Sequence, residues 1–175
     1  MIRVAIATLP KLFPNLADQL AGGTSPASTE WWQLVPGSIY DGDTLRVARD
    51  GQELKVRLCG IDAPEMEQPG GVESRDHLRS LVAQGNDAIG VVPIEEDQYG
   101  RLVADLVVMR SDDSEVHLNS QMVADGVAYR YARYSNTCSQ PDVLVRAEEQ
   151  AKSTGAGLWV KPRIERPWNY RKSLL

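Results

Sequence analysis

The dipeptide Asp50-Gly51 lies between two short runs in which polar and apolar residues alternate. An alternation with a period of two residues is typical of a β-strand. Asp-Gly is a preferred pair for the tight turn that joins two antiparallel strands. The sequence therefore predicts a β-hairpin, with its strands at residues 44–47 and 54–61.

Acidic residues lie at both ends of this hairpin. Asp43 precedes its first strand, and Asp62 and Glu65 follow its second strand, which also carries Arg57. Because a hairpin folds the chain back on itself, these four side chains are expected to lie close together. Acidic residues at strand ends are often simple turn formers, but turn chemistry does not account for the arginine. Three carboxylates beside a guanidinium group indicate a hard-cation site next to a phosphate site.

The chain resembles the staphylococcal nuclease (thermonuclease) family in several motifs, which occur in that family's order and approximate spacing. They are Asp41-Gly42-Asp43-Thr44, Arg57-Leu58, Asp62-Ala63-Pro64-Glu65, Asp97-Gln98-Tyr99-Gly100-Arg101 and, after the last predicted helix, Gly155-Ala156-Gly157-Leu158-Trp159. The resemblance covers residues from about 35 to 168. Linked motifs in order are far more specific than any one of them alone.

Hydrophobic periodicity elsewhere predicts further elements that agree with this resemblance. Strands are expected at residues 34–39, 88–94 and 102–109, and helices at residues 72–84, 118–125 and 143–153. His77 lies off the apolar stripe of the first helix, so we expect it at the surface. Short strands with interposed helices fit a partly open Greek-key barrel. The resemblance implies the same fold: an α+β domain with a five-stranded OB-fold barrel and three helices.

The resemblance also implies a role for each motif residue. A Ca²⁺ ion would be held by Asp43, Asp62 and the backbone carbonyl of Ala63, and oxygen ligands suit this ion. Glu65 would be the general base that activates water. Arg57 and Arg101 would bind the phosphate, because their forked donors match phosphate oxygens.

Other residues are expected to support this site or to bind the substrate. Asp41 and Thr44 are interpreted as supports of the metal ligands. The run Tyr129-Arg130-Tyr131-Ala132-Arg133-Tyr134 interleaves aromatic and basic residues, which is typical of a surface for single-stranded nucleic acid. An amphipathic strand with half-buried tyrosines is the alternative. The residues assigned to substrate binding are Tyr99, Tyr131, Arg133 and Tyr134.

The predicted function is a Ca²⁺-dependent endonuclease that hydrolyses DNA and RNA, preferably single strands, and leaves 3′-phosphate ends. Two positions depart from the family pattern: Ala63 stands where threonine is frequent, and Gln98 where lysine is common. Two alternatives remain, a noncatalytic OB-fold that binds nucleic acid and a calcium-stabilised interaction domain. The first class typically loses the catalytic arginines and carboxylates, whereas this chain has them. The second leaves both arginines unexplained.

The two cysteines, Cys59 and Cys138, lack the spacing of metal ligands, and neither has a histidine partner that would indicate a nucleophile. Cys59 shares a strand face with Arg57, and Cys138 follows the tyrosine-rich run that should flank the site. A disulfide is therefore plausible, and two free thiols are the alternative.

Composition and the chain ends complete the expectations. A length of 175 residues with 42% hydrophobic residues suits one globular domain, expected at residues 33–160 and as a monomer. The net charge of −5 is unusual for a nucleic-acid enzyme, so local charge must decide binding.

Residues 1–32 are predicted to be an extension or linker in which Pro10 and Lys11 interrupt any signal-like run, and no run is long enough for a stable membrane span. The resemblance nonetheless favours an exported protein. Residues 161–175 form a basic tail, expected to be loosely packed with Pro167-Trp168 as its anchor.

Overall fold

The computed structural model describes residues 29–160 and 164–174, and its centre is a closed barrel of five strands. β1 pairs with β2 and β5, β2 pairs with β3, and β5 pairs with β6. A parallel pairing of β3 with β6 closes the ring, which confirms the predicted OB-fold-like α+β domain. The barrel strands are β1 (Glu30–Leu34), β2 (Thr44–Arg49), β3 (Gln52–Leu58), β5 (Ala88–Glu96) and β6 (Leu102–Met109).

Three short strands add to the barrel. β7 (Glu115–His117) extends the sheet beyond β6. β4 (Ile61–Asp62) and β8 (Tyr129–Arg130) form a separate antiparallel pair. This pair places Asp62 opposite Tyr129, so the acidic end of the hairpin is joined directly to the tyrosine-rich run.

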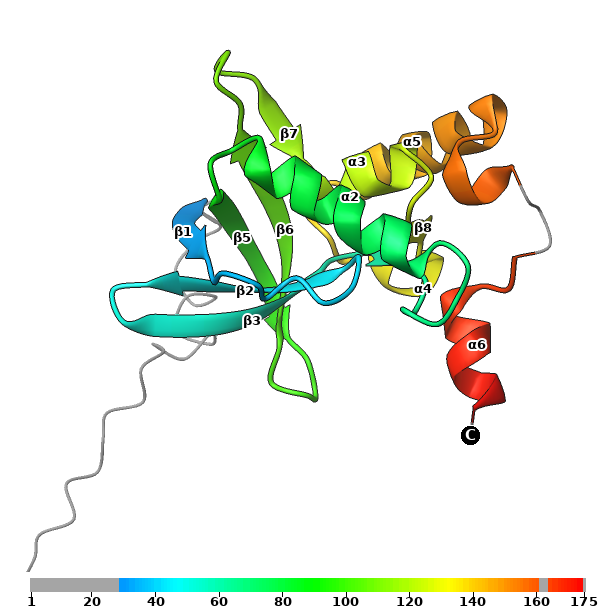
Figure 1. The fold of residues 1–175 in the computed structure, drawn as a ribbon, viewed down its shortest axis with the longest axis horizontal. Coiled ribbons are helices and arrows are strands. Elements are labelled where there is room, and N and C mark those ends of the chain that lie inside the picture. The colour runs from blue at the N-terminus through cyan, green and yellow to red at the C-terminus, as the bar shows by residue number, and fades with distance from the viewer. Residues whose placement is uncertain (1–28, 161–163, 175) are drawn as a thin grey trace, which may run out of the picture.

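The β2–β3 hairpin is present as predicted. Asp50 and Gly51 both have positive φ, 52° and 79°, as the favoured two-residue turn requires. The register pairs Thr44 with Arg57 across the two strands. In Figure 1 the hairpin projects to one side of the molecule while its other end meets the helices.

Two predicted strands have the wrong limits. The first barrel strand is β1 at Glu30–Leu34, not the expected strand at residues 34–39. Pro36-Gly37 forms a turn instead, because proline lacks an N–H for strand pairing and Gly37 has a φ of 73°. Residues 30–32, assigned to the extension, therefore belong to the barrel, and Trp32 is buried in it. The strand expected at residues 54–61 is divided, because Gly60, with a φ of 69°, separates β3 from β4.

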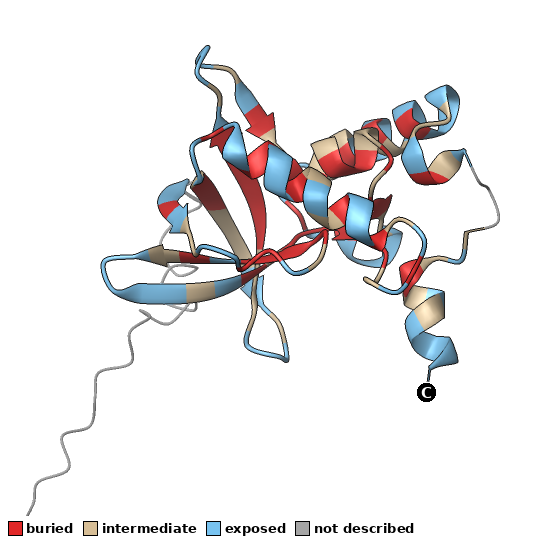
Figure 2. Cartoon of the chain, in the orientation of Figure 1, coloured by how far each residue is buried: buried red, intermediate tan, exposed pale blue. Residues whose placement is uncertain are grey.

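The three predicted helices are present as α2 (Gly71–Ala83), α3 (Leu118–Ala124) and α5 (Pro141–Thr154). Leu78, Leu81 and Val82 of α2 are buried, as the apolar stripe predicted, and Figure 2 shows the buried positions turned inward on these helices. His77 is only partly exposed, because its Nε2 lies 2.7 Å from the Asp125 carboxylate of the loop after α3. Three shorter helical segments were not predicted: α4 (Ala132–Ser135), the 3₁₀ turn η1 (Gly157–Trp159) and α6 (Pro167–Ser173).

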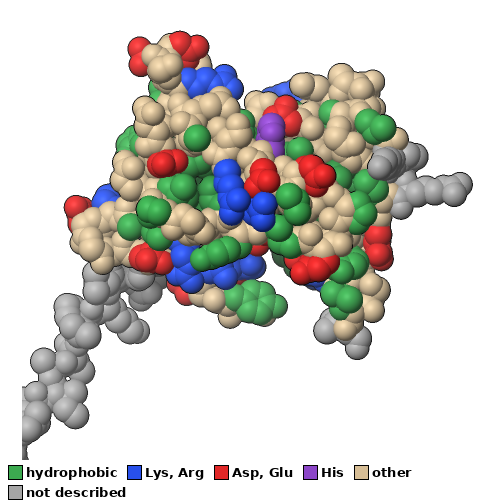
Figure 3. Space-filling view, viewed as in Figure 1, with side chains coloured by type: hydrophobic (Ala, Val, Ile, Leu, Met, Phe, Trp, Pro, Cys, Tyr) green, Lys and Arg blue, Asp and Glu red, His purple; other side chains and the backbone are tan. Residues whose placement is uncertain are grey.

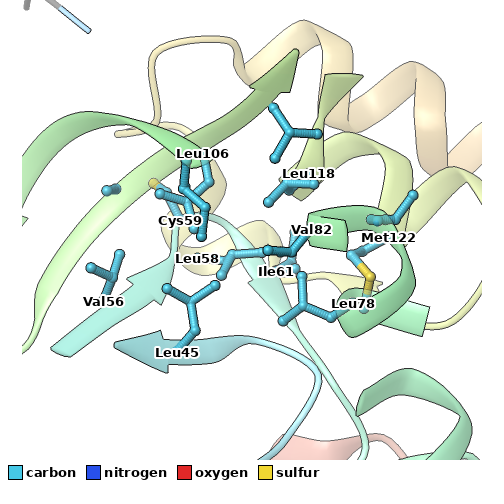
Figure 4. Close-up of a cluster of buried hydrophobic side chains, with 14 of the residues drawn as sticks. Leu45, Val56, Leu58, Cys59, Ile61, Leu78, Val82, Leu106, Leu118 and Met122 are labelled. Carbon is cyan, nitrogen blue, oxygen red and sulfur yellow. The ribbon is translucent and has the colours of Figure 1, made fainter. Parts of the chain in front are cut away.

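The hydrophobic core lies between the barrel and the helices. Figure 4 shows side chains from β2, β3, β6, α2 and α3 meeting in one cluster, which includes Leu45, Leu58, Leu78 and Met122. Burial of such side chains stabilises the fold by about 1.5–3 kcal/mol each relative to leaving them exposed. The core therefore fixes the hairpin, which carries most of the predicted site residues, against α2 and α3.

The predictions for the two chain ends have different outcomes. Residues 1–28, most of the predicted extension, lie outside the described residues, and the possible signal segment falls within them. The tail was expected to pack loosely with Pro167-Trp168 as its anchor. Pro167 is buried and Trp168 stacks on Tyr131, so these two residues do pack against the domain. Loose packing is wrong for Arg171, whose guanidinium group pairs with Asp62 and Glu65. In the described ranges no helix is both long and apolar enough to cross a membrane.

Candidate active site

The loop before β2 presents two aspartates at the end of the hairpin. The Asp41 carboxylate accepts hydrogen bonds from the backbone N–H groups of Asp43 (3.1 Å) and Thr44 (2.7 Å). The Thr44 hydroxyl in turn donates to Asp43 at 3.1 Å. A side chain at Gly42 would collide with the Ser74 hydroxyl of α2, since an added Cβ would lie 1.9 Å from it. Asp41 and Thr44 thus hold the backbone and the carboxylate of Asp43 in place.

Arg57 holds the two expected metal-binding aspartates together. Its Nη1 lies 3.1 Å from an oxygen of Asp43, and its Nη2 lies 2.9 Å from Asp62. Asp62 is fully buried. Ala63 contributes its N–H, which donates to Asp43 at 2.7 Å. The hairpin therefore brings the three residues Asp43, Arg57 and Asp62 into contact, as the sequence predicted.

Glu65 is connected to this cluster by an arginine of the tail. Arg171 Nη1 lies 2.7 Å from Glu65 Oε1 and 3.1 Å from Asp62 Oδ1, and its Nη2 lies 2.7 Å from Asp62 Oδ2. The backbone N–H of Glu65 donates to the Gln68 side chain at 2.9 Å, which fixes the turn that carries Glu65. The three carboxylates of the predicted site are therefore gathered around two guanidinium groups.

Arg101 lines the same cleft as this cluster. Val103 of β6 pairs with Arg57 of β3, and Arg101 lies two residues earlier, on the same face of the sheet. Its guanidinium group is paired with Asp97 at 2.7 Å and lies 5.4 Å from the ring centre of Tyr99. Arg101 thus shares the cleft with Arg57 without touching the carboxylates.

A cleft of about 710 Å³ joins these groups. It is lined by most of the residues predicted for the site, together with others from the same loops: Asp41, Asp43, Thr44, Arg57, Leu58, Cys59, Gly60, Ile61, Ala63, Pro64, Glu65, Glu95, Asp97, Gln98, Tyr99, Arg101, Val103, Tyr131, Tyr134, Thr137 and Arg171. Two predicted site residues, Asp62 and Arg133, are not in this lining. Asp62 is fully buried behind it. Arg133 is exposed, and its guanidinium group lies 5.4 Å from the ring centre of Tyr134.

The tyrosine-rich run is not the amphipathic strand of the alternative reading. Tyr129 is in the core, Tyr131 lies at the cleft, and Tyr134 is 45% exposed on α4. The rings of Tyr131 and Tyr134 meet edge to face, 4.9 Å apart. The backbone N–H of Tyr131 donates to the Gly60 carbonyl, which attaches this run to the hairpin end.

Cys59 and Cys138 form a disulfide, so of the two alternatives the structure contains the bridge. Cys59 directly follows β3, and Cys138 precedes α5. The bridge therefore joins the barrel to the segment that carries Tyr131 and Tyr134, and its Cys59 lines the cleft.

The electrostatics of the cluster favour a cation. Four carboxylates, those of Asp41, Asp43, Asp62 and Glu65, meet only two guanidinium groups, an excess of two negative charges. Burial, and then the negative charge of Asp43, raise the pKa of Asp41 to about 6. Burial also raises the pKa of Asp62, although its bonds to arginine oppose this shift. An added dication would balance the excess charge.

Sequence reasoning missed Arg171, Gln68 and Asp97 as parts of the site. Asp97 was recognisable within its motif, since it precedes Arg101 by four residues. Gln68 and Arg171 carried no local signal, because the contact of Arg171 with Asp62 spans 109 residues.

Comparisons with known proteins agree with the motifs. A family model described as staphylococcal nuclease homologue matches residues 55–161. The chain is 34% identical to Protein ParB of Escherichia coli, over 83% of this chain and 84% of that protein. It is 32% identical to a micrococcal nuclease of Shigella flexneri, over 77% of this chain and 78% of that protein. It is 33% identical to an uncharacterized endonuclease of Haemophilus influenzae, over 77% of this chain and 70% of that protein.

The family model covers more than half of the chain, and these relatives match it over most of their own length. The matched region also contains Arg57, Glu65 and Arg101, which line one cleft. The chain therefore belongs to the staphylococcal nuclease family.

Proposed function

We propose that this protein is a Ca²⁺-dependent nuclease that hydrolyses phosphodiester bonds in DNA and RNA and leaves 3′-phosphate ends. The observation that carries the proposal is the cleft that Glu65, Arg57 and Arg101 line together, next to the buried Asp43 and Asp62. A nucleic-acid-binding module has no need of a carboxylate base in the same cleft as two arginines. Names of relatives such as micrococcal nuclease and endonuclease support the same reaction class.

The residues present fit a calcium ion. Asp43 and Asp62 offer hard oxygen ligands, and the excess of two negative charges around them is what a dication balances. The carbonyl of Ala63 is the third proposed ligand. When bound, Ca²⁺ would supply positive charge to the phosphate and to the attacking water.

The remaining steps are performed by the side chains of the cleft. Glu65 accepts the proton of the attacking water as general base. Arg57 and Arg101 donate to the phosphate oxygens, and these bonds strengthen as charge develops in the transition state. Asp97 positions Arg101 through its bonds at 2.7 Å. Arg101 is not assigned as a proton donor, because a guanidinium group has a pKa above about 12.

Substrate binding is assigned to the aromatic residues around the cleft. Tyr99 is 74% exposed on the loop that carries Arg101. Tyr131 and Tyr134 present rings from the other side, on which unpaired bases can stack. This arrangement favours single strands, whose bases are free. The Cys59–Cys138 disulfide supports the proposal that the protein acts in an oxidising compartment.

The test is cleavage of end-labelled single-stranded DNA and RNA with Ca²⁺ or with chelator, followed by phosphatase treatment to identify the product ends. Wild type is expected to cut only with Ca²⁺ and to leave phosphatase-sensitive 3′ ends. Glu65→Gln keeps the shape of the side chain but removes the base, so the rate should fall by about 10² to 10⁴ while binding remains. Glu67→Gln, a change at an exposed neighbour, is the matched control.

Two results would count against the proposal. Binding of single strands with no cleavage under any condition would assign the chain to the noncatalytic OB-fold class. Undiminished cleavage by Glu65→Gln would leave a nuclease but remove the assignment of Glu65 as its base.

A further inference from the structure

The tail helix α6 contacts the candidate active site through Arg171 and Trp168, although much of the helix is exposed. Figure 1 shows α6 at the lower right, below α4, on the helical side of the molecule. The helix has only seven residues, and an isolated helix of this length is unstable in water. Contacts with the site must therefore hold it in place.

Arg171 of α6 occupies the carboxylates that the proposed function needs. Its guanidinium group binds both oxygens of Asp62 and one oxygen of Glu65, with separations of 2.7 to 3.1 Å. Asp62 is a proposed metal ligand, and Glu65 is the proposed base. Without Arg171 the four carboxylates would have Arg57 alone as a counter-charge, an excess of three negative charges, and the docked Arg171 lowers this excess to two. A water molecule or a cation that approaches Asp62 and Glu65 competes with this side chain.

Trp168 packs on Tyr131, a residue that lines the cleft. Its indole is stacked on the Tyr131 ring with centres 4.9 Å apart and planes 3° from parallel. This is the geometry in which a nucleic-acid base stacks on an aromatic side chain. Trp168 thus covers one face of the ring proposed to receive the substrate. Through Arg171 and Trp168, α6 contacts the carboxylates and the proposed base-binding ring at the same time.

The segment just before α6 has contacts of its own with the rest of the domain. The Arg166 guanidinium group lies 3.8 Å from the ring centre of Tyr129 and 4.5 Å from that of Trp159. The Gln68 side chain, which also holds the turn of Glu65, donates to the Glu165 carbonyl at 3.2 Å. These contacts can keep the tail near the cleft when α6 itself is released.

We propose that α6 is an autoinhibitory segment, in which Arg171 takes the place of the metal ion and Trp168 takes the place of a base. The inference rests on the proposed function, because it assigns the blocked groups to metal and substrate binding. Ca²⁺ and single-stranded nucleic acid each compete with α6, so the docked tail lowers the apparent affinity for both. A tail that is docked nine-tenths of the time raises an apparent dissociation constant about tenfold.

The first test is calorimetric titration of full-length protein with Ca²⁺, comparing wild type with Arg171→Gln and Lys172→Gln. Arg171→Gln should bind Ca²⁺ about tenfold more tightly than wild type. Lys172→Gln removes the same charge from an exposed neighbour and should match wild type. Equal or weaker binding by Arg171→Gln, or an equal gain in both variants, would overturn the inference. Absence of Ca²⁺ binding in all three proteins is a different result, which would remove the proposed metal dependence and this inference with it.

The second test measures binding of a fluorescent oligothymidylate in chelator, where cleavage is not expected. Trp168→Ala exposes Tyr131 and should tighten binding, whereas Trp31→Ala changes an exposed tryptophan of β1 and should not. Weaker binding by Trp168→Ala would show that the indole belongs to the substrate platform, which contradicts autoinhibition.

Discussion

At the scale of single residues, the site depends on charges held where water is scarce. Asp62 is fully buried, and Arg57 and Arg171 compensate its charge directly. Breaking one partner out of a buried ion pair is strongly destabilising, because the other charge is left without compensation. The identity of these residues therefore reflects both chemistry and folding, and a metal ion would add a third source of compensation.

Asp41 offers a test of this charge excess. Its pKa in the folded protein is raised to about 6, above the ordinary value of 3.8, so the folded state binds the proton more tightly than the unfolded state. Stability from this group is therefore full below about pH 4 and is lost as the pH rises to about 6. Asp41→Asn cannot ionise and keeps an oxygen for the N–H groups of Asp43 and Thr44.

We accordingly expect Asp41→Asn to be more stable than wild type at pH 7.5 in chelator and equal to it near pH 4. Urea unfolding at both pH values measures the difference. Glu67→Gln serves as the control, with no pH-dependent gain. An equal gain for Asp41→Asn at both pH values would show that the charge is not the cause.

At the scale of elements, the site is formed where strands stop. β3 ends at Leu58, and Gly60 turns the chain so that β4 leaves the barrel and pairs with β8. Asn119 of α3 stabilises this junction by hydrogen bonds to backbone groups just after β3 and on β6. Its amide group donates to the carbonyls of Cys59 (3.0 Å) and Ala104 (3.2 Å), and its oxygen accepts from the Leu106 N–H (2.9 Å).

Replacing Asn119 with alanine should destabilise the protein by about 2 kcal/mol or more, because buried backbone groups lose their partners. Ser120→Ala, one residue later, removes only a partly exposed hydroxyl and should cost less than about 1 kcal/mol. Denaturant unfolding of both variants tests the comparison. Equal losses would mean that Asn119 contributes no more than a surface residue.

At the scale of the whole molecule, a barrel and a helical layer are joined across the cleft. The net charge of −5 does not describe how charge is distributed on the surface, since Figure 3 shows acidic and basic side chains interspersed on the visible face. The Cys59–Cys138 disulfide links the two parts across a sequence separation of 79 residues. A loop of this length, when closed in the unfolded chain, corresponds to about 4 kcal/mol of stabilisation in the chain-entropy model.

Full reduction should therefore lower the free energy of unfolding by about 4 kcal/mol and add two hydrogens to the intact mass. The double variant Cys59→Ala with Cys138→Ala should be insensitive to reductant, which makes it the control. Unchanged stability after complete reduction, confirmed by mass, would show that packing alone holds the two parts together.

The sequence by itself determined the local features of this protein and the identity of its main site residues. Asp50-Gly51 specified the hairpin because only a few residue pairs adopt two consecutive positive φ angles, and the hairpin brought Asp43, Arg57 and Asp62 together. The apolar stripe of α2 was equally local. The limits of β1 were not local, because they follow from where β2 and β5 pair with it.

Only the tertiary structure decided which distant segments meet. The parallel contact of β3 with β6, the β4–β8 pair and the docking of α6 each join residues far apart in the chain. Such contacts depend on the shape and charge of a surface that exists only after the core has formed, so no local pattern encodes them. Arg171 shows this most clearly: in the sequence it is one more basic residue of a tail, and in the fold it neutralises a buried aspartate.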